Sequence, residues 1–261
     1  MRIRDGAQFA IQLHTAYCRS PGAAKRLHRR ATVLQFLESS IVGLRSAIHE
    51  LASPKYRVNF LLLPMIHIAD GSFYAAIRAR LSSCDVVIVE GVRTFQSRLI
   101  TLSYRIPAKR SSLGLVLQSD ALRQRELPGV TIHGDMDPES FALSWSEIPW
   151  IQRMAVLLLA PLYGVAMYLF ASREYFTRRH TVDSLPDHPD HGLSQVRELI
   201  LDERDRSLIE RIESCLAERP DDQRKVAILF GGGHMPAVAE MLTSRHAYRV
   251  VHSEWITAIA T

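Results

Sequence analysis

The stretch that decides the fold is VNFLLLPMIHIADGSFYAAIRARLSSCDVVIVE, residues 58–90. Its first ten residues form a short apolar run and residues 85–90 form a second one, as is typical of strands that are buried on both faces. Between them, a turn at residues 69–72 leads into an amphipathic helix over 73–81. A strand, a helix and a strand in this order predict a parallel pair joined by a right-handed crossover.

The same alternation continues along the rest of the chain. Strands are predicted over 129–135, 225–233 and 248–255, and helices over 93–104, 115–126, 193–219 and 236–245. Another helix is predicted to begin after Asp137, which stands where an N-cap is expected, with Pro138 as the first helical residue. The expected fold class is therefore α/β, with a mostly parallel central sheet flanked by helices.

The N-terminal part of the chain carries its excess of positive charge. Residues 1–57 hold ten Lys and Arg residues and three acids, a net charge of +7, which leaves −2 for residues 58–261 out of +5 for the whole chain. Apolar residues at positions 34, 37, 41, 44, 48 and 51 follow the three-four spacing of one helix face. We therefore expect a basic helical extension, residues 1–56, before an α/β domain, residues 57–261.

Residues 154–171, MAVLLLAPLYGVAMYLFA, contain no charged side chain. Eighteen apolar residues are at the lower limit for a membrane span, and a fully buried helix can have the same composition. A single span would separate the two halves of the sheet, so we expect a hairpin or kinked helix inserted at about 150–178. Buried core or a homodimer interface is the first expectation for it. Peripheral contact with a membrane, together with the basic N-terminal arm, is the second.

The composition excludes several classes of function. Cys18, Cys84 and Cys215 lie far apart and form no CxxC pair, which excludes a zinc knuckle or a thioredoxin-like motif and fits a reducing compartment. We therefore expect a cytoplasmic protein, or one peripheral to the inner membrane. Nucleic acid is not an expected partner, because the positive charge lies on the extension and no recognition motif accompanies it.

Polar residues that can take part in chemistry stand at the ends of four predicted strands. They are His67, Glu90, Asp135 and His234, the last preceded by Gly231, Gly232 and Gly233. The carboxyl ends of parallel strands share one edge of a sheet, where ligands bind. Two imidazoles and a carboxylate at this edge are suited to a divalent metal that activates water. The three glycines are expected to let the backbone turn tightly and to leave space for a ligand.

The same motifs resemble those of the TraB/PrgY/GumN/Tiki family. The similar segments are residues 64–92, GDMDPESFALSW (134–145), LILDERDRSLIERI (199–212) and ILFGGGHMPAVAEML (228–242). The second GxxH motif of the family is complete at residues 231–234, and Glu90 stands at the position of its glutamate. Arg204 and Asp205 fall in its helical motif. In the first GxxH motif, which ends at His67, Pro64 replaces the glycine.

The resemblance implies a fold related to the erythromycin-esterase-like and ChaN-like proteins. For the Tiki branch it implies a metal-dependent protease that uses both GxxH histidines and the glutamate, with manganese or cobalt, or alternatively zinc. We therefore expect a metal-dependent hydrolase for a peptide or a small molecule, with Glu90 as metal ligand and catalytic residue. Arg204 would stabilise a developing oxyanion or bind a substrate carboxylate. Asp135 and Asp205 would be further ligands or would orient a histidine.

A second hypothesis belongs to another class of function. The chain could be a non-catalytic protein of this family that sequesters a peptide or another ligand near a membrane. The altered motif at Pro64 and the uncharged segment favour this hypothesis, whereas the complete motif before His234 and the presence of Glu90 favour the enzyme.

Overall fold

The computed structural model describes residues 34–178, 196, 198–218 and 223–261. The strands are β1 (Leu37–Ser40), β2 (Gly43–Ala52), β3 (Val58–Met65), β4 (Ile68–Ala69), β5 (Val86–Val89), β6 (Val116–Leu117), β7 (Val130–His133), β8 (Arg224–Gly231) and β9 (Arg249–Ala260). The α-helices are α2 (Gly71–Leu81), α3 (Phe95–Arg105), α4 (Gln118–Ala121), α5 (Pro138–Glu147), α6 (Trp150–Phe170), α7 (Arg173–Arg178), α9 (Arg204–Glu218) and α10 (Met235–His246). Short helical turns are η2 (Pro107–Lys109), η3 (Ser111–Leu113), η4 (Gln124–Glu126) and η7 (Gly232–His234), and η6 (Glu198–Glu203) is a π-helix.

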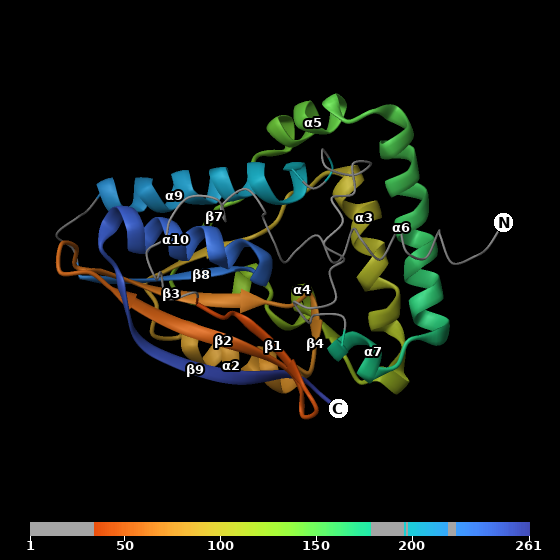
Figure 1. Cartoon of the computed structure of the whole chain (residues 1–261), viewed down its shortest axis with the longest axis horizontal. Coiled ribbons are helices and arrows are strands. Elements are labelled where there is room, and N and C mark those ends of the chain that lie inside the picture. Colours follow the sequence, from red (N-terminus) through yellow and green to blue (C-terminus); the bar gives the residue numbers. More distant parts are fainter. Residues whose placement is uncertain (1–33, 179–195, 197, 219–222) are drawn as a thin grey trace, which may run out of the picture.

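A seven-stranded mixed sheet forms the centre of the described residues (Figure 1). Strands β3, β8, β5 and β7 are adjacent in this order and parallel. Strands β1, β3 and β9 all pair with β2 in the antiparallel direction. The prediction of an α/β fold with mostly parallel strands flanked by helices is confirmed at this level.

The prediction of a helix over residues 34–51 is wrong. These residues form the hairpin of β1 and β2, with Ile41 95% exposed in its turn. The helical spacing arises because β2 is buried on both faces: Leu44 and Ile48 belong to one core cluster and Leu51 to the other. The expected domain boundary at residue 56 is therefore wrong as well, since β1 and β2 are part of the sheet. Residues 1–33 of the predicted extension lie outside the described residues.

Each face of the sheet has its own hydrophobic core. Along β3, Leu61 and Leu63 pack into the cluster that contains α2, whereas Phe60 and Leu62 pack into the cluster that contains α9 and α10. This is the alternation that a pleated strand imposes, with successive side chains on opposite faces. Figure 1 shows α9 and α10 above the sheet and α2 below it. The parallel strands β3, β8 and β5 are thus buried between two helical layers, whereas the edge strand β7 is partly exposed.

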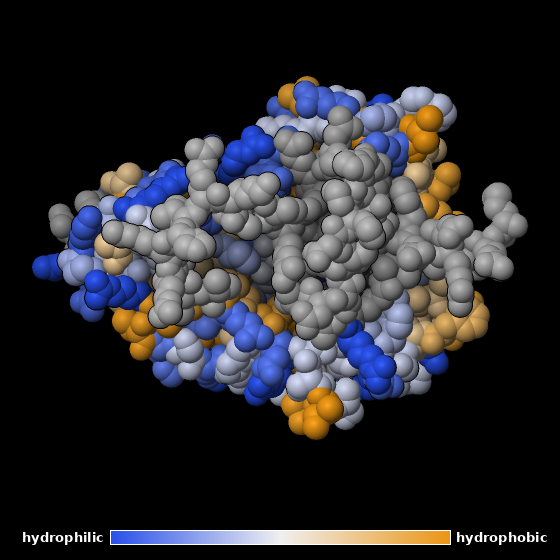
Figure 2. All heavy atoms as spheres, in the orientation of Figure 1, coloured by the Kyte–Doolittle hydropathy of each residue, from blue (hydrophilic) through white to orange (hydrophobic). Residues whose placement is uncertain are grey.

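The uncharged segment lies in one continuous helix, α6, rather than in a hairpin. Its buried face packs on α3, where Gly164 allows close approach: a Cβ at this residue would lie 2.4 Å from the backbone oxygen of Leu102. The expectation of a buried core role is wrong, because a full stripe of large apolar side chains on α6 is exposed. They are Trp150, Ile151, Met154, Leu158, Leu162, Val165, Tyr168, Leu169 and Phe170. Figure 2 shows hydrophobic residues along this edge of the molecule.

Candidate functional site

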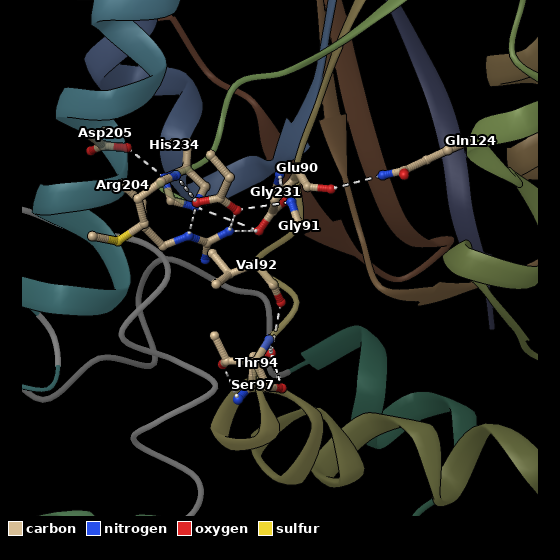
Figure 3. A network of polar contacts seen from close by, with 12 residues as sticks. Glu90, Gly91, Val92, Thr94, Ser97, Gln124, Arg204, Asp205, Gly231 and His234 are labelled. Atoms are coloured by element: carbon tan, nitrogen blue, oxygen red, sulfur yellow. Dashed lines mark hydrogen bonds and ion pairs between the residues drawn. The ribbon is translucent and has the colours of Figure 1, made fainter. Parts of the chain in front are cut away.

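The four predicted strand-end residues lie at one edge of the sheet, as the topology requires. His67, Glu90, Asp135 and His234 each follow the last residue of β3, β5, β7 and β8 by one to three positions. Because these strands are adjacent and parallel, their carboxyl ends meet at the same edge. Arg204, at the start of α9, reaches the same edge from the helical layer above it (Figure 3).

Arg204 is the centre of a buried ion-pair network. Its Nε and Nη2 donate to the two carboxylate oxygens of Asp135 at 2.8 and 2.6 Å, and Nη2 also donates to Oε1 of Glu90 at 2.6 Å. Asp135 further accepts from the backbone N–H groups of Gly91 and Met136, at 2.9 and 3.0 Å. Fork-to-carboxylate pairing of this kind is among the strongest polar contacts in proteins. Asp135 therefore orients Arg204 and not a histidine, which corrects part of its predicted role.

Glu90 ties two parallel strands together at their ends. Its Oε2 accepts from the backbone N–H of Gly231 at 2.6 Å, while its Oε1 accepts from Arg204. The same Oε1 lies 3.8 Å from Nε2 of His234. The Glu90 side chain is only 9% exposed, so both of its oxygens are held within the protein at defined positions.

His234 is fully buried and is oriented by Asp205. Its Nδ1 lies 2.6 Å from Oδ1 of Asp205, and the Phe230 ring contacts the imidazole edge-on. Because an ionised carboxylate can only accept, Nδ1 is the protonated nitrogen, and Nε2 is the nitrogen that faces Glu90. The π-helix η6 ends directly before Arg204 and widens the helical turn there, as such bulges commonly do at functional sites.

His67 follows β3 and lies against Tyr104 of α3. Its ring stacks on Tyr104, with 4.5 Å between ring centroids and 14° between the planes, and its backbone oxygen accepts from the N–H of Gln118. Burial lowers the pKa of His67, and the nearby negative charge of Glu90 only partly opposes this. The imidazole is therefore neutral at pH 7, the form that binds metals. Pro64 lies within β3, where its carbonyl accepts from the Ser46 hydroxyl at 2.8 Å.

The glycines before His234 have structural roles that the sequence did not specify. Gly231 donates its N–H to Glu90. Gly232 faces the side chain of Leu37, and an added Cβ would lie 2.8 Å from Cδ1 of that leucine. The space expected for a ligand at this glycine is therefore occupied by the β1 strand. Gly233 continues the short helical turn η7 that carries His234.

A cavity of about 1310 Å³ opens beside the network. His67, Glu90 and Arg204 line it, whereas His234 and Asp135 do not. One wall is α3, and the other is formed by residues 117–126, where the structure has the four-residue helix α4 and the short turn η4 rather than one continuous helix over 115–126.

The side chains at this edge of the sheet are of the chemical types that bind a divalent metal. Two imidazoles and a carboxylate are typical ligands, and the Asp205 carboxylate behind His234 is the usual outer partner of a metal-binding histidine. A ligand–metal distance of about 2.1 Å allows one ion to bridge the 3.8 Å between Nε2 of His234 and Oε1 of Glu90. Arg204 holds the same oxygen, however, and across the described ranges no three His, Cys, Asp or Glu side chains are gathered as a metal site requires.

The sequence did not point to the side chains around His67. Tyr104 and Gln118 contact this histidine, but they come from segments whose contact with β3 exists only in the folded chain. The polar residues Ser97, Thr101 and Tyr104 recur at helical spacing on α3 and all line the cavity, a pattern that could have indicated it. Comparisons with protein-family models, curated proteins and solved structures find no match to this chain.

Proposed function

We propose that this chain is a metal-dependent hydrolase that acts on peptide bonds and holds a divalent metal with His67, Glu90 and His234. The observation that carries the proposal is the line Asp205–His234–Glu90, in which a 2.6 Å contact fixes the imidazole and its Nε2 faces a carboxylate oxygen. The likeness of the motifs to the TraB/PrgY/GumN/Tiki family supports the same function. The finer fold assignment, to the erythromycin-esterase-like and ChaN-like proteins, is part of this proposal.

The residues of the chain have distinct tasks in this hydrolysis. The chemistry that a divalent metal supplies at such a site is a bound water acidic enough to be a nucleophile near neutral pH. Glu90 would hold the metal through Oε1, which lies 3.8 Å from Nε2 of His234, and would take the proton of the attacking water on its second oxygen, Oε2. Arg204, held by two contacts to Asp135, places positive charge beside the cavity and stabilises an oxyanion there. Tyr104, which stacks on His67, positions the substrate from the α3 side.

Metal content tests the proposal directly. The purified chain is loaded with manganese, cobalt or zinc and desalted, and the bound metal is measured by mass spectrometry, alongside Glu90→Gln and His234→Ala. The control is His252→Ala, an exposed histidine on β9. We expect one equivalent in the wild type and the control, and loss in the two site variants. A folded wild type that binds none of the three metals would overturn the proposal.

A second function, peptide binding without cleavage, is favoured because both carboxylate oxygens of Glu90 already accept hydrogen bonds within the protein. Both of its oxygens have short contacts inside the protein, to Arg204 and to the N–H of Gly231, and such a carboxylate can be a structural clamp. The chain would then bind a peptide in its open cavity without cleaving it. Peptide binding by metal-free protein, with no cleavage product after addition of metal, distinguishes this function from hydrolysis.

We also propose that α6 contacts the surface of an anionic membrane. Its buried face is held by α3, so its exposed apolar stripe can lie along a surface for about 30 Å, the length of a 21-residue helix. Cationic side chains stand at both ends of the stripe: Arg153 at the start, and Lys109 and Arg110 at the end, where Arg110 donates to the backbone oxygen of Leu169. By length and composition alone α6 also passes as a membrane span. A cytoplasmic location at the inner membrane fits this proposal.

Vesicle binding tests the role of α6. Leu158→Asp, at a side chain that is 59% exposed, should release the protein from phosphatidylserine vesicles without lowering its melting temperature. The matched control is Leu143→Asp, at a 69% exposed leucine on α5. Absence of vesicle binding in the wild type would overturn the proposal, and a Leu158-dependent dimer in sedimentation would assign the stripe to a second copy instead.

A further inference from the structure

The cavity beside Glu90 is strongly basic. Six arginines line it, namely Arg93, Arg98, Arg105, Arg123, Arg125 and Arg204. Two glutamates, Glu90 and Glu126, are the acids of the lining, so its formal charge is +4 with neutral histidines. Residues 58–261 as a whole sum to −2, so this concentration of positive charge does not reflect the composition of the domain. A concave surface lined by one sign of charge focuses the potential and attracts ligands of the opposite sign.

Among the described residues, most of this charge has no neighbouring carboxylate to neutralise it. Glu90 pairs with Arg204, and Glu126 pairs with Arg123 at 3.3 Å. The other four arginines of the lining have no carboxylate partner within the described ranges; one of them, Arg93, donates to the amide oxygen of Gln124. All four side chains are exposed, so their guanidinium groups can reach a ligand in the cavity.

The unpaired arginines lie on both sides of Glu90. Arg98 and Arg105 stand two turns apart on α3, one wall of the cavity. Arg125 belongs to the opposite wall, which is joined to the end of β5 by the contact of Gln124 with the backbone oxygen of Glu90 (Figure 3). A ligand that spans the cavity across Glu90 would meet positive charge at each end.

We propose that the substrate of this cavity is an acidic peptide, with aspartate or glutamate side chains on both sides of the bond that faces Glu90; this specificity rests on the hydrolase function proposed above. The guanidinium fork matches a carboxylate in shape and charge, which makes arginine the usual reader of acidic side chains. The Thr101 hydroxyl donates to the backbone oxygen of Arg98 and can accept a peptide N–H along the α3 wall. At about 1310 Å³, the cavity exceeds the roughly 300–1,000 Å³ of small-molecule sites and has room for several residues.

The test measures binding of a fluorescein-labelled octapeptide of alternating aspartate and alanine by fluorescence anisotropy. Its matched control has asparagine in place of aspartate. The full chain is compared with Arg98→Gln/Arg105→Gln, with Arg125→Gln and with Arg249→Gln, an exposed arginine on β9 outside the cavity. We expect the acidic peptide alone to bind, at least tenfold weaker binding in the double variant, weaker binding in Arg125→Gln, and no change in Arg249→Gln. Binding should also weaken as salt is raised.

Equal binding of the two peptides, or wild-type affinity in both cavity variants, would overturn the inference. The melting temperature serves as the control for folding, since Arg98, Arg105 and Arg125 are exposed. Metal content is measured in the same samples. Loss of peptide binding with retained metal shows that the arginines read the substrate. Acidic-peptide binding by a chain that takes up no metal would leave the specificity standing while the hydrolase function fails.

Discussion

Replacing Arg204 with methionine should leave the two buried carboxylates of Glu90 and Asp135 without a counter-charge. The side chains of Arg204, Glu90 and Asp135 are 11%, 9% and 1% exposed, so their contacts are those of a buried network and not of a surface pair. Removing one partner of a buried ion pair costs about 3–5 kcal/mol, because the remaining charge is left desolvated. The backbone N–H donors of Gly91 and Gly231 remain in place and keep the expected loss of unfolding free energy within this range.

Urea unfolding at pH 7, followed by tryptophan fluorescence, measures this loss. The matched control is Arg123→Met, which removes an ion pair with Glu126 whose side chains are 67% and 47% exposed; it should change the free energy by less than about 1 kcal/mol. A second control neutralises all three members as Arg204→Met/Glu90→Gln/Asp135→Asn. Because no buried charge is then left, most of the lost stability should return.

Two outcomes would refute this reasoning. A loss of less than about 1 kcal/mol for Arg204→Met, comparable to that of the surface control, would mean that water or another group neutralises Glu90 and Asp135. A triple variant as unstable as Arg204→Met would mean that the loss comes from packing of the arginine stem rather than from charge. The denaturant slope should not change in either variant, since the surface exposed on unfolding is the same.

Three further predictions follow from single contacts. Gly164→Ala places a Cβ 2.4 Å from the backbone oxygen of Leu102, so α3 and α6 must separate; we expect a loss of about 1–3 kcal/mol in urea unfolding, and an unchanged stability would contradict the close packing. Hydrogen bonds from the first turn of α5 lower the pKa of Asp137, so Asp137→Ala should lower the melting temperature at pH 7. The difference in melting temperature between the wild type and this variant should shrink as the pH falls through the lowered pKa of the folded state. An equal difference at all pH values would contradict the prediction. If manganese binds at Glu90, calorimetry should show at least tenfold tighter binding in Arg204→Met, which removes a competing cation; weaker binding would place the metal elsewhere.

The position of the site followed from the sequence because it depends on strand order alone. The apolar runs that end at His67, Glu90, Asp135 and His234 predict strands, and parallel strands bring their carboxyl ends to one edge whatever their register. The N-cap at Asp137 was also predictable, since its side chain accepts from the backbone of the next turn, a contact within four residues.

The hairpin at residues 37–52 could not be recognised from periodicity. A strand buried on both faces loses its alternation of apolar and polar residues, so Leu44, Ile48 and Leu51 fall by chance at helical spacing. Ile41 completes the false pattern from an exposed turn. The partner strand β9 lies about 200 residues away in sequence, and its pairing with β2 is what fixes the segment as a strand.

The contacts of Arg204 were equally hidden, because sequence alone does not say which carboxylate a helical arginine meets. Asp135 lies 69 residues before it and Glu90 lies 114 residues before it. With Arg206 and Glu210 nearby on the same helix, the segment reads as an ordinary solvated helix face. The basic cavity was hidden for the same reason, since its arginines come from α3, from the loop before it, from residues 117–126 and from the start of α9.

The proposed metal site and the proposed substrate cavity share one atom, Oε1 of Glu90. This oxygen accepts a hydrogen bond from Arg204 at 2.6 Å and also lies 3.8 Å from Nε2 of His234. A divalent cation at His234 would therefore have to share or displace the Arg204 contact, while the pair of contacts to Asp135 keeps the guanidinium in place. An arginine released from Glu90 has an N–H group to donate to a substrate at the cavity. Metal binding and substrate binding would then be coupled through Arg204, each favouring the arrangement that the other requires.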